Sequence, residues 1–174
     1  MDITRAGDRL VTVGERGFTL VSDDAGQSWR AVATPVTRSL TRVAFENDKL
    51  GVAVGHGGSI VRTEDGGETW TAVAVEEAGV DSLLGVTSLG GNRFAAYGAF
   101  GLYFTSEDGG ATWSEVIVDE AGPDSLLGVT HVAGDHFIAY GAFGLYFDSQ
   151  DAGKTWQRVT VLSEDFDRHI SQII

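Results

Sequence analysis

Four tryptophans divide this chain into units of nearly equal length. Trp29, Trp70, Trp113 and Trp156 are separated by 41, 43 and 43 residues. A fixed spacing of about 20 to 50 residues indicates stacked supersecondary units, and spacings of about 40 to 50 are typical of four-stranded propeller blades. Because the four units cover nearly all of the 174 residues, this repeat limits the possible folds more than any other feature of the sequence.

Each tryptophan ends an eight-residue motif rich in acidic residues and glycine. The four variants are "SDDAGQSW" (22–29), "TEDGGETW" (63–70), "SEDGGATW" (106–113) and "SQDAGKTW" (149–156). Asp and Ser side chains bond nearby backbone N–H groups in turns, glycine accepts a positive φ, and an aromatic ring anchors a loop on apolar surface. Since a ring would hold the four carboxylates far apart, a shared acid or metal site is disfavoured. We therefore predict structural roles for Asp24, Trp29, Asp65, Trp70, Asp108, Trp113, Asp151 and Trp156.

Within one unit the sequence predicts four short strands. In the third unit these are residues 82–89, 93–98, 101–106 and 112–118, separated by glycine or acidic turns. The second and third strands are almost continuously apolar, which is typical of sheets covered on both faces. We predict an all-β fold, a β-propeller of four-stranded antiparallel blades. The four blades span about 1–36, 37–79, 80–122 and 123–165, and an extra inner strand follows at 166–174.

The repeated motif resembles the Asp-box, or bacterial neuraminidase repeat. The longer stretch "AVGHGGSIVRTEDGGETW" (53–70) is similar to the repeat of the photosystem II assembly and stability factor family. The resemblance implies a propeller that acts as a non-catalytic protein-interaction scaffold, working outside the cytoplasm in a full-length parent protein. It also implies an arginine-rich partner surface, and this chain departs from that pattern because its arginines are scattered among an excess of acids.

Charge and composition exclude several classes of function. With 25 acidic and 12 basic residues the net charge is −13, which opposes the phosphate backbone, so we predict no nucleic-acid partner. The chain has no cysteine, and its four histidines show no metal-ligand spacing. We predict neither a metal nor a cofactor. The first ten residues do not resemble a signal peptide, and no apolar run is long enough for membrane insertion.

One face of the predicted disc gathers the candidate binding residues. Alternating chain direction places the turn between the second and third strands of each blade on the same face as the connection between blades. The two phenylalanines there either form a protein-binding or glycan-stacking patch or cover the neighbouring blade. The acids attract a basic protein segment, hold a weakly bound Ca²⁺, or are solvated surface. The candidate residues are Arg16, His56, Tyr97, Phe100, Tyr140, Phe143, Glu76, Glu77, Asp119 and Glu120.

The alternative function is a carbohydrate-active propeller, sialidase-like or glycan-binding. Tyr97 and Tyr140 lie near this face, where a sialidase nucleophile would be needed, but they recur at one repeat position as packing residues do. No arginine motif precedes the repeats, and no acid shows an environment that would shift its pKa for glycoside hydrolysis. We therefore predict that the protein is not an enzyme.

The two ends of the sequence complement each other. The first blade begins partway through its inner strand, and "RHISQII" (168–174) aligns with the start of an inner strand. Three arrangements follow: a piece of a longer propeller, a half-ring whose two copies close an eight-bladed disc, or a four-bladed ring. In the second, self-association places Arg168 to Ile174 in the first blade of the partner copy.

Overall fold

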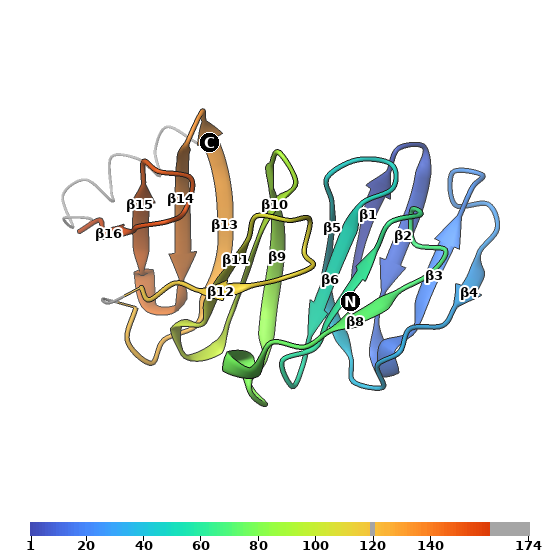
Figure 1. The fold of residues 1–174 in the computed structure, drawn as a ribbon, viewed down its shortest axis with the longest axis horizontal. Coiled ribbons are helices and arrows are strands. Elements are labelled where there is room, and N and C mark those ends of the chain that lie inside the picture. The colour runs from blue at the N-terminus through green and yellow to red at the C-terminus, as the bar shows by residue number, and fades with distance from the viewer. Residues whose placement is uncertain (119–120, 161–174) are drawn as a thin grey trace.

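The computed structural model, described here for residues 1–118 and 121–160, is an all-β protein of four antiparallel four-stranded sheets. The predicted fold class is confirmed. In every sheet the strands follow chain order, and we number the sheets blade 1 to blade 4 from the N-terminus (Figure 1). Blade 1 holds β1 (Asp2–Ala6), β2 (Arg9–Val13), β3 (Thr19–Ser22) and β4 (Arg30–Val32), and blade 2 holds β5 (Leu40–Phe45), β6 (Gly51–Gly55), β7 (Ile60–Thr63) and β8 (Thr71–Val73). Blade 3 holds β9 (Leu83–Gly90), β10 (Arg93–Gly98), β11 (Tyr103–Ser106) and β12 (Ser114–Glu115), and blade 4 holds β13 (Leu126–Ala133), β14 (His136–Gly141), β15 (Tyr146–Ser149) and β16 (Gln157–Arg158).

The second strand of each inner blade is buried because a neighbouring sheet covers each of its faces. All five residues of β6 are buried, and so are five of the six residues of β10. This explains the near-continuous apolar runs in the sequence, since a strand with one wet face would alternate apolar and polar residues.

The core lies in the three junctions between successive blades. At each junction the tryptophan that ends the Asp-box of the later blade packs on the earlier blade. Trp70 joins a cluster with blade 1, Trp113 packs against a cluster that includes blade 2, and Trp156 lies edge-on to Tyr103 of blade 3 at a ring-centroid distance of 5.4 Å. Arginines add polar links: Arg9 Nη1 donates to Gly66 O at 3.1 Å and Arg62 Nε to Gly109 O at 2.6 Å.

The four blades stand in an open row. Blades 1 and 4 lie at opposite ends of the long axis, so they do not close a four-bladed ring (Figure 1). The predicted extra inner strand at 166–174 lies outside the described residues.

The outer strands are shorter than the sequence predicts. The fourth strand of blade 3 was expected over 112–118, yet β12 covers only Ser114–Glu115. Val116 N still donates to Tyr103 O at 2.9 Å, after which the chain leaves the sheet to cross to blade 4. Residues 116–118 therefore form a connection rather than the end of a strand.

Candidate functional site

The Asp-boxes are closed hydrogen-bond networks. In the second box, Asp65 Oδ1 accepts from Thr69 N at 2.9 Å and Asp65 Oδ2 accepts from Thr69 Oγ1 at 2.6 Å. Thr63 Oγ1 donates to Asp65 Oδ1 at 2.8 Å and accepts from Gly67 N at 2.9 Å. The same pattern recurs around Asp24, Asp108 and Asp151.

These hydrogen bonds stabilise the charged form of the carboxylates. Donation from Ser28 lowers the pKa of Asp24 to about 2, and donation from Thr112 lowers the pKa of Asp108 to about 2. Burial opposes the shift at Asp65, where the hydrogen bonds from Thr69 still hold the pKa below its usual value. A carboxylate held this way is a poor general acid. Nor do the described residues contain a group of three or more histidines and acids placed to hold a metal ion.

The Asp-boxes lie on one face of the row, which we call the Asp-box face. The boxes of blades 2, 3 and 4 are hydrogen-bonded to the turn between the first and second strands of their own blade, as in Gly66 N to Lys49 O at 2.9 Å and Gly109 N to Asn92 O at 2.7 Å. The opposite face, which we call the turn face, carries the turns between the second and third strands together with the connections between blades. Hydrogen bonds join these two parts, for example Ala99 N to Ser82 O at 2.9 Å.

The four turns of the turn face share a left-handed backbone position. Its φ is 55° at Arg16, 65° at Gly57, 55° at Phe100 and 55° at Phe143. Glycine adopts this conformation freely, but other residues are strained in it. A strained backbone maintained by its surroundings is a starting point for a hypothesis of function, and here two of the four positions hold a large aromatic residue.

Phe100 and Phe143 point to solvent. They are 64% and 92% exposed. For Phe100, which has blade 4 as its neighbour, the alternative that the ring covers the neighbouring blade therefore does not describe the structure. Two rings at equivalent turns of adjacent blades form an apolar pair on the turn face.

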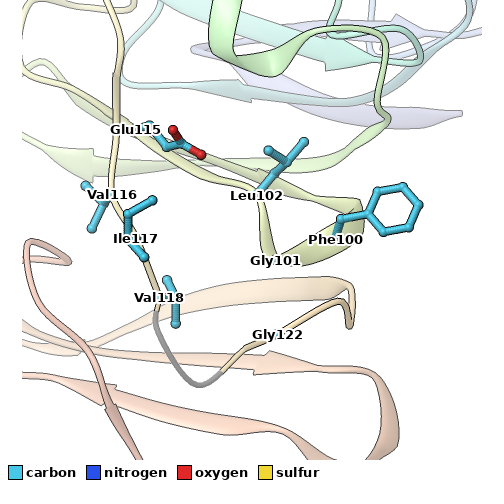
Figure 2. Close-up of a pocket in the computed structure, with 8 residues that line it drawn as sticks. All are labelled: Phe100, Gly101, Leu102, Glu115, Val116, Ile117, Val118 and Gly122. Carbon is cyan, nitrogen blue, oxygen red and sulfur yellow. The ribbon is translucent and has the colours of Figure 1, made fainter.

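A cavity of about 220 Å³ lies beside Phe100. Leu102 lines it from the turn, and Val116, Ile117 and Val118 line it from the connection that leaves β12 (Figure 2). In Figure 2 the ring of Phe100 extends away from the other labelled side chains, at the rim of the cavity. The cavity and the exposed ring together offer a site of mixed character, with apolar side chains beside the carboxylate of Glu115.

The polar candidates lie on the same face. His56 Nδ1 is 2.8 Å from Ser82 Oγ of the following connection, and Arg16 is exposed in the turn of blade 1. Glu76 and Glu77 are exposed on a 3₁₀ turn, Glu76–Ala78, that precedes blade 3. Asp119 and Glu120 lie outside the described residues.

The two tyrosines of the candidate face differ from each other. Tyr97 is only 5% exposed, and its ring lies over Gly85, where an added Cβ would come within 2.2 Å of the ring. Its inclusion in an exposed binding face was wrong, because blade 4 covers it. Tyr140 lies over Gly128 in the same way but is 44% exposed. A buried Tyr97 is not available to act as a nucleophile.

Sequence reasoning missed the connection residues of the site. Ile117 and its neighbours read as the end of a strand, and only the early end of β12 reveals them as cavity lining. Ser82 gave no signal beyond its place before an inner strand. No sequence pattern indicates Arg38 either, although its side chain lies against the Gly57 turn. The positive φ of Phe100 and Phe143 could have been inferred, since both align with Gly57 in the repeat.

Comparison with known proteins places this geometry in context. The family model described as photosynthesis system II assembly factor YCF48 matches residues 21–165. A structure of YCF48 bound to D1 peptide has a TM-score of 0.72 and 17% sequence identity, over 94% of this chain and 53% of that one. YCF48 from Cyanidioschyzon merolae has a TM-score of 0.70 and 21% identity, over 93% of this chain and 56% of that one.

Enzymes share the fold as well. An ancestral GH74 enzyme has a TM-score of 0.78 and 17% identity, over 94% of this chain and 24% of its own. Because these structures are only 17–21% identical to this chain, the similarity establishes the fold alone. The chain spans about half the length of the two YCF48 structures. A search of curated proteins finds no match. Among the described residues no helix is long and apolar enough to cross a membrane.

Proposed function

The chain belongs to the photosynthesis system II assembly factor YCF48 family, and we propose that it is a non-catalytic scaffold that binds an extended segment of a partner protein on its turn face. A solved YCF48 structure with similar fold holds a D1 peptide. That protein is 17% identical to this chain, so the neighbour supports the kind of partner, a peptide, rather than its sequence.

The observation that carries the proposal is the pair of exposed phenylalanines held at strained backbone positions. Exposed aromatic residues grouped on one surface are typical of protein interaction sites. Glu76 and Glu77 on the same face favour partner segments that carry basic residues beside their apolar ones.

Two observations favour a scaffold over a carbohydrate-active propeller. Of the two tyrosines that could serve a sialidase mechanism, Tyr97 is buried, and Tyr140 remains for the test below. The Asp-box carboxylates are occupied by hydrogen bonds within their own turns. The GH74 neighbour adds only a shared fold, because its identity is 17%. A fluorogenic sialoside assay tests this directly: turnover that Tyr140→Phe abolishes would contradict the scaffold proposal.

The binding proposal is tested by titrating a fluorescently labelled D1 peptide with the protein and following anisotropy. We expect saturable binding that weakens about tenfold or more in Phe100→Ala and in Phe143→Ala, since truncating a central aromatic contact typically costs over 1 kcal/mol. Lys154→Ala, an exposed change on the Asp-box face, is the control and leaves affinity unchanged. No saturable binding, or equal affinity in all variants, overturns the proposal.

Two further expectations belong to this proposal. Family membership supports an extracytoplasmic location for a full-length parent protein, which cell fractionation of that parent tests. The exchange of Arg168 to Ile174 between two copies stays a prediction, because these residues lie outside the described part of the chain.

A further inference from the structure

The outer rim of blade 2 differs from the rims of the other three blades. β8 is the last strand of its sheet, and no strand of the described residues pairs with its outer edge (Figure 1). Proteins commonly protect such edges with charged side chains. The outer strands β4, β12 and β16 each hold one, at Arg30, Glu115 and Arg158, whereas β8 has the sequence TAV. Of the four outer strands, β8 is therefore the least protected against the addition of another strand.

The backbone of Ala72 offers hydrogen-bonding groups at this edge. In blade 3, Val116 N donates to Tyr103 O at 2.9 Å. Bonded and non-bonded pairs alternate along an antiparallel ladder, so the backbone N–H and C=O of Glu115, the preceding residue, point away from β11. Ala72 is the repeat counterpart of Glu115 and is exposed. Its N–H and C=O therefore face the free edge of β8.

A groove of about 450 Å³ lies beside this edge, at the junction of blades 2 and 3. Residues 71–74 and Ala111 line it with small side chains. Arg62 also lines it, with Nε donating to Gly109 O at 2.6 Å and Nη2 donating to Glu64 Oε1 at 2.8 Å. The Glu64 side chain is 73% exposed. The groove thus combines uncharged walls with an accessible carboxylate.

At the junction of blades 1 and 2, an ion pair occupies the equivalent place. Arg30 is the repeat counterpart of Thr71, and Glu68 is that of Ala111. The guanidinium of Arg30 forms an ion pair with the carboxylate of Glu68, across the two blades. Because Thr71 and Ala111 are too short to make this pair, the groove between blades 2 and 3 stays open. It has room for a long side chain supplied by another molecule.

The repeat also indicates the charge of that side chain. Arg30 Nη2 lies 3.8 Å from Asp23 Oδ2, and Arg9 Nε lies 2.6 Å from Asp23 Oδ1. Glu64 is the counterpart of Asp23, and among the described residues it pairs with Arg62 alone. A carboxylate at this repeat position therefore accepts two guanidinium groups, and Glu64 has one. The net charge of −13 also favours a cation.

We infer that an extended segment of a partner protein adds to the outer edge of β8 and places an arginine side chain in the groove, toward Glu64. In this mode of recognition, main-chain hydrogen bonds supply affinity and a pocket for a side chain supplies specificity. Ala72 provides the main-chain groups here, and the groove provides the pocket. The surface lies on the rim, separate from the turn face, and it makes no use of the Asp-box carboxylates.

Two labelled peptides test the inference by fluorescence anisotropy. Both are capped and threonine-rich, and they differ only at the central residue, which is arginine in one and glutamate in the other. The arginine peptide is expected to bind about tenfold more tightly, because the glutamate peptide sets a like charge against Glu64. Equal affinity for the two peptides, or no saturable binding of either, overturns the inference.

A double substitution that closes the groove tests its location. Thr71→Arg combined with Ala111→Glu copies the ion pair of blades 1 and 2, so affinity for the arginine peptide should fall about tenfold or more. Ser114→Arg combined with Lys154→Glu makes the same change between blades 3 and 4 and is the matched control, which leaves affinity unchanged. Circular dichroism checks that both proteins fold. Undiminished binding by the first protein overturns the inference.

Two single substitutions separate the side-chain and main-chain contacts. Glu64→Gln should weaken the arginine peptide and not the glutamate peptide, whereas Glu107→Gln, at the same repeat position of blade 3, changes neither. Ala72→Pro removes the outward N–H and should weaken both peptides, whereas Ala31→Pro, its counterpart in β4, does not. Equal effects within either pair overturn the inference. The closed-groove protein should still bind the D1 peptide on its turn face, so this inference and the proposed function fail separately.

Discussion

The backbone strain at Phe143 predicts that removing its side chain can stabilise the protein, which is the opposite of what an argument from packing alone predicts. Removing a phenylalanine usually costs free energy because buried area is lost. Phe143 is 92% exposed, so its ring buries almost nothing in the fold. Its backbone, with φ at 55°, lies in the left-handed region that costs a residue with a Cβ roughly 1–2 kcal/mol.

Phe143→Gly should therefore stabilise the protein. Glycine removes the free-energy penalty of the left-handed backbone. Because glycine also loses more chain entropy on folding, about 0.5–1 kcal/mol of this gain is offset. The net gain is about 0.5–1 kcal/mol. In a protein of this size, that raises Tm by about 1–4 °C.

Phe143→Ala separates backbone strain from loss of the ring. Alanine also lacks the ring but keeps the Cβ, so its stability should stay within about 0.5 kcal/mol of wild type. Urea unfolding of the three proteins followed by tryptophan fluorescence measures the difference. If Phe143→Gly is no more stable than Phe143→Ala, the strain argument is refuted. A gain in stability together with weaker peptide binding would indicate that the strained residue is kept for function.

Two further predictions concern the rest of the framework. Asp24 and Asp108 have pKa values of about 2, below the ordinary 3.8, so they stabilise the fold above about pH 4 and this stabilisation is lost as the pH falls from about 4 to about 2. The free energy of unfolding, measured across that range, should depend less steeply on pH in Asp108→Asn than in the wild-type protein. The same pH dependence in both proteins would contradict a stabilising role for the Asp108 carboxylate. Gly85→Ala should destabilise by about 1–3 kcal/mol because its Cβ would strike the buried ring of Tyr97. Gly128→Ala should cost less, since Tyr140 is free to move outward, and equal losses in thermal unfolding would refute the distinction.

The repeat made the fold predictable from the sequence. Tryptophan spacing and apolar runs arise from packing that is repeated at each junction, so one unit predicts the others. The Asp-box could be interpreted for the same reason, because its hydrogen bonds are local: Asp65 and Thr69 are four residues apart.

The binding face was predictable only in part. Arg16, His56, Phe100 and Phe143 follow from strand alternation, which places the turns on one face. Whether a residue is buried depends on which neighbouring blade packs on it, and the position of the residue within its repeat does not determine this. Tyr97 and Tyr140 have the same local sequence, yet Tyr97 is buried against blade 4 whereas Tyr140, in the last described blade, is 44% exposed.

The cavity beside Phe100 could not be predicted from the sequence pattern, for a different reason. Ile117 belongs to an apolar run that fits a strand, and the end of β12 at Glu115 depends on where the chain must cross to blade 4. Such an end is a property of the assembled blades rather than of the local residues.

The central claim is that the turn face binds the partner whereas the Asp-boxes only maintain the fold. Hydrogen–deuterium exchange of the free and the peptide-bound protein tests this claim most directly. We expect protection on binding at residues 98–102 and 141–145 and along the connection at 116–118, with the four Asp-boxes unchanged. Protection confined to the Asp-boxes would contradict this division of roles between the two faces.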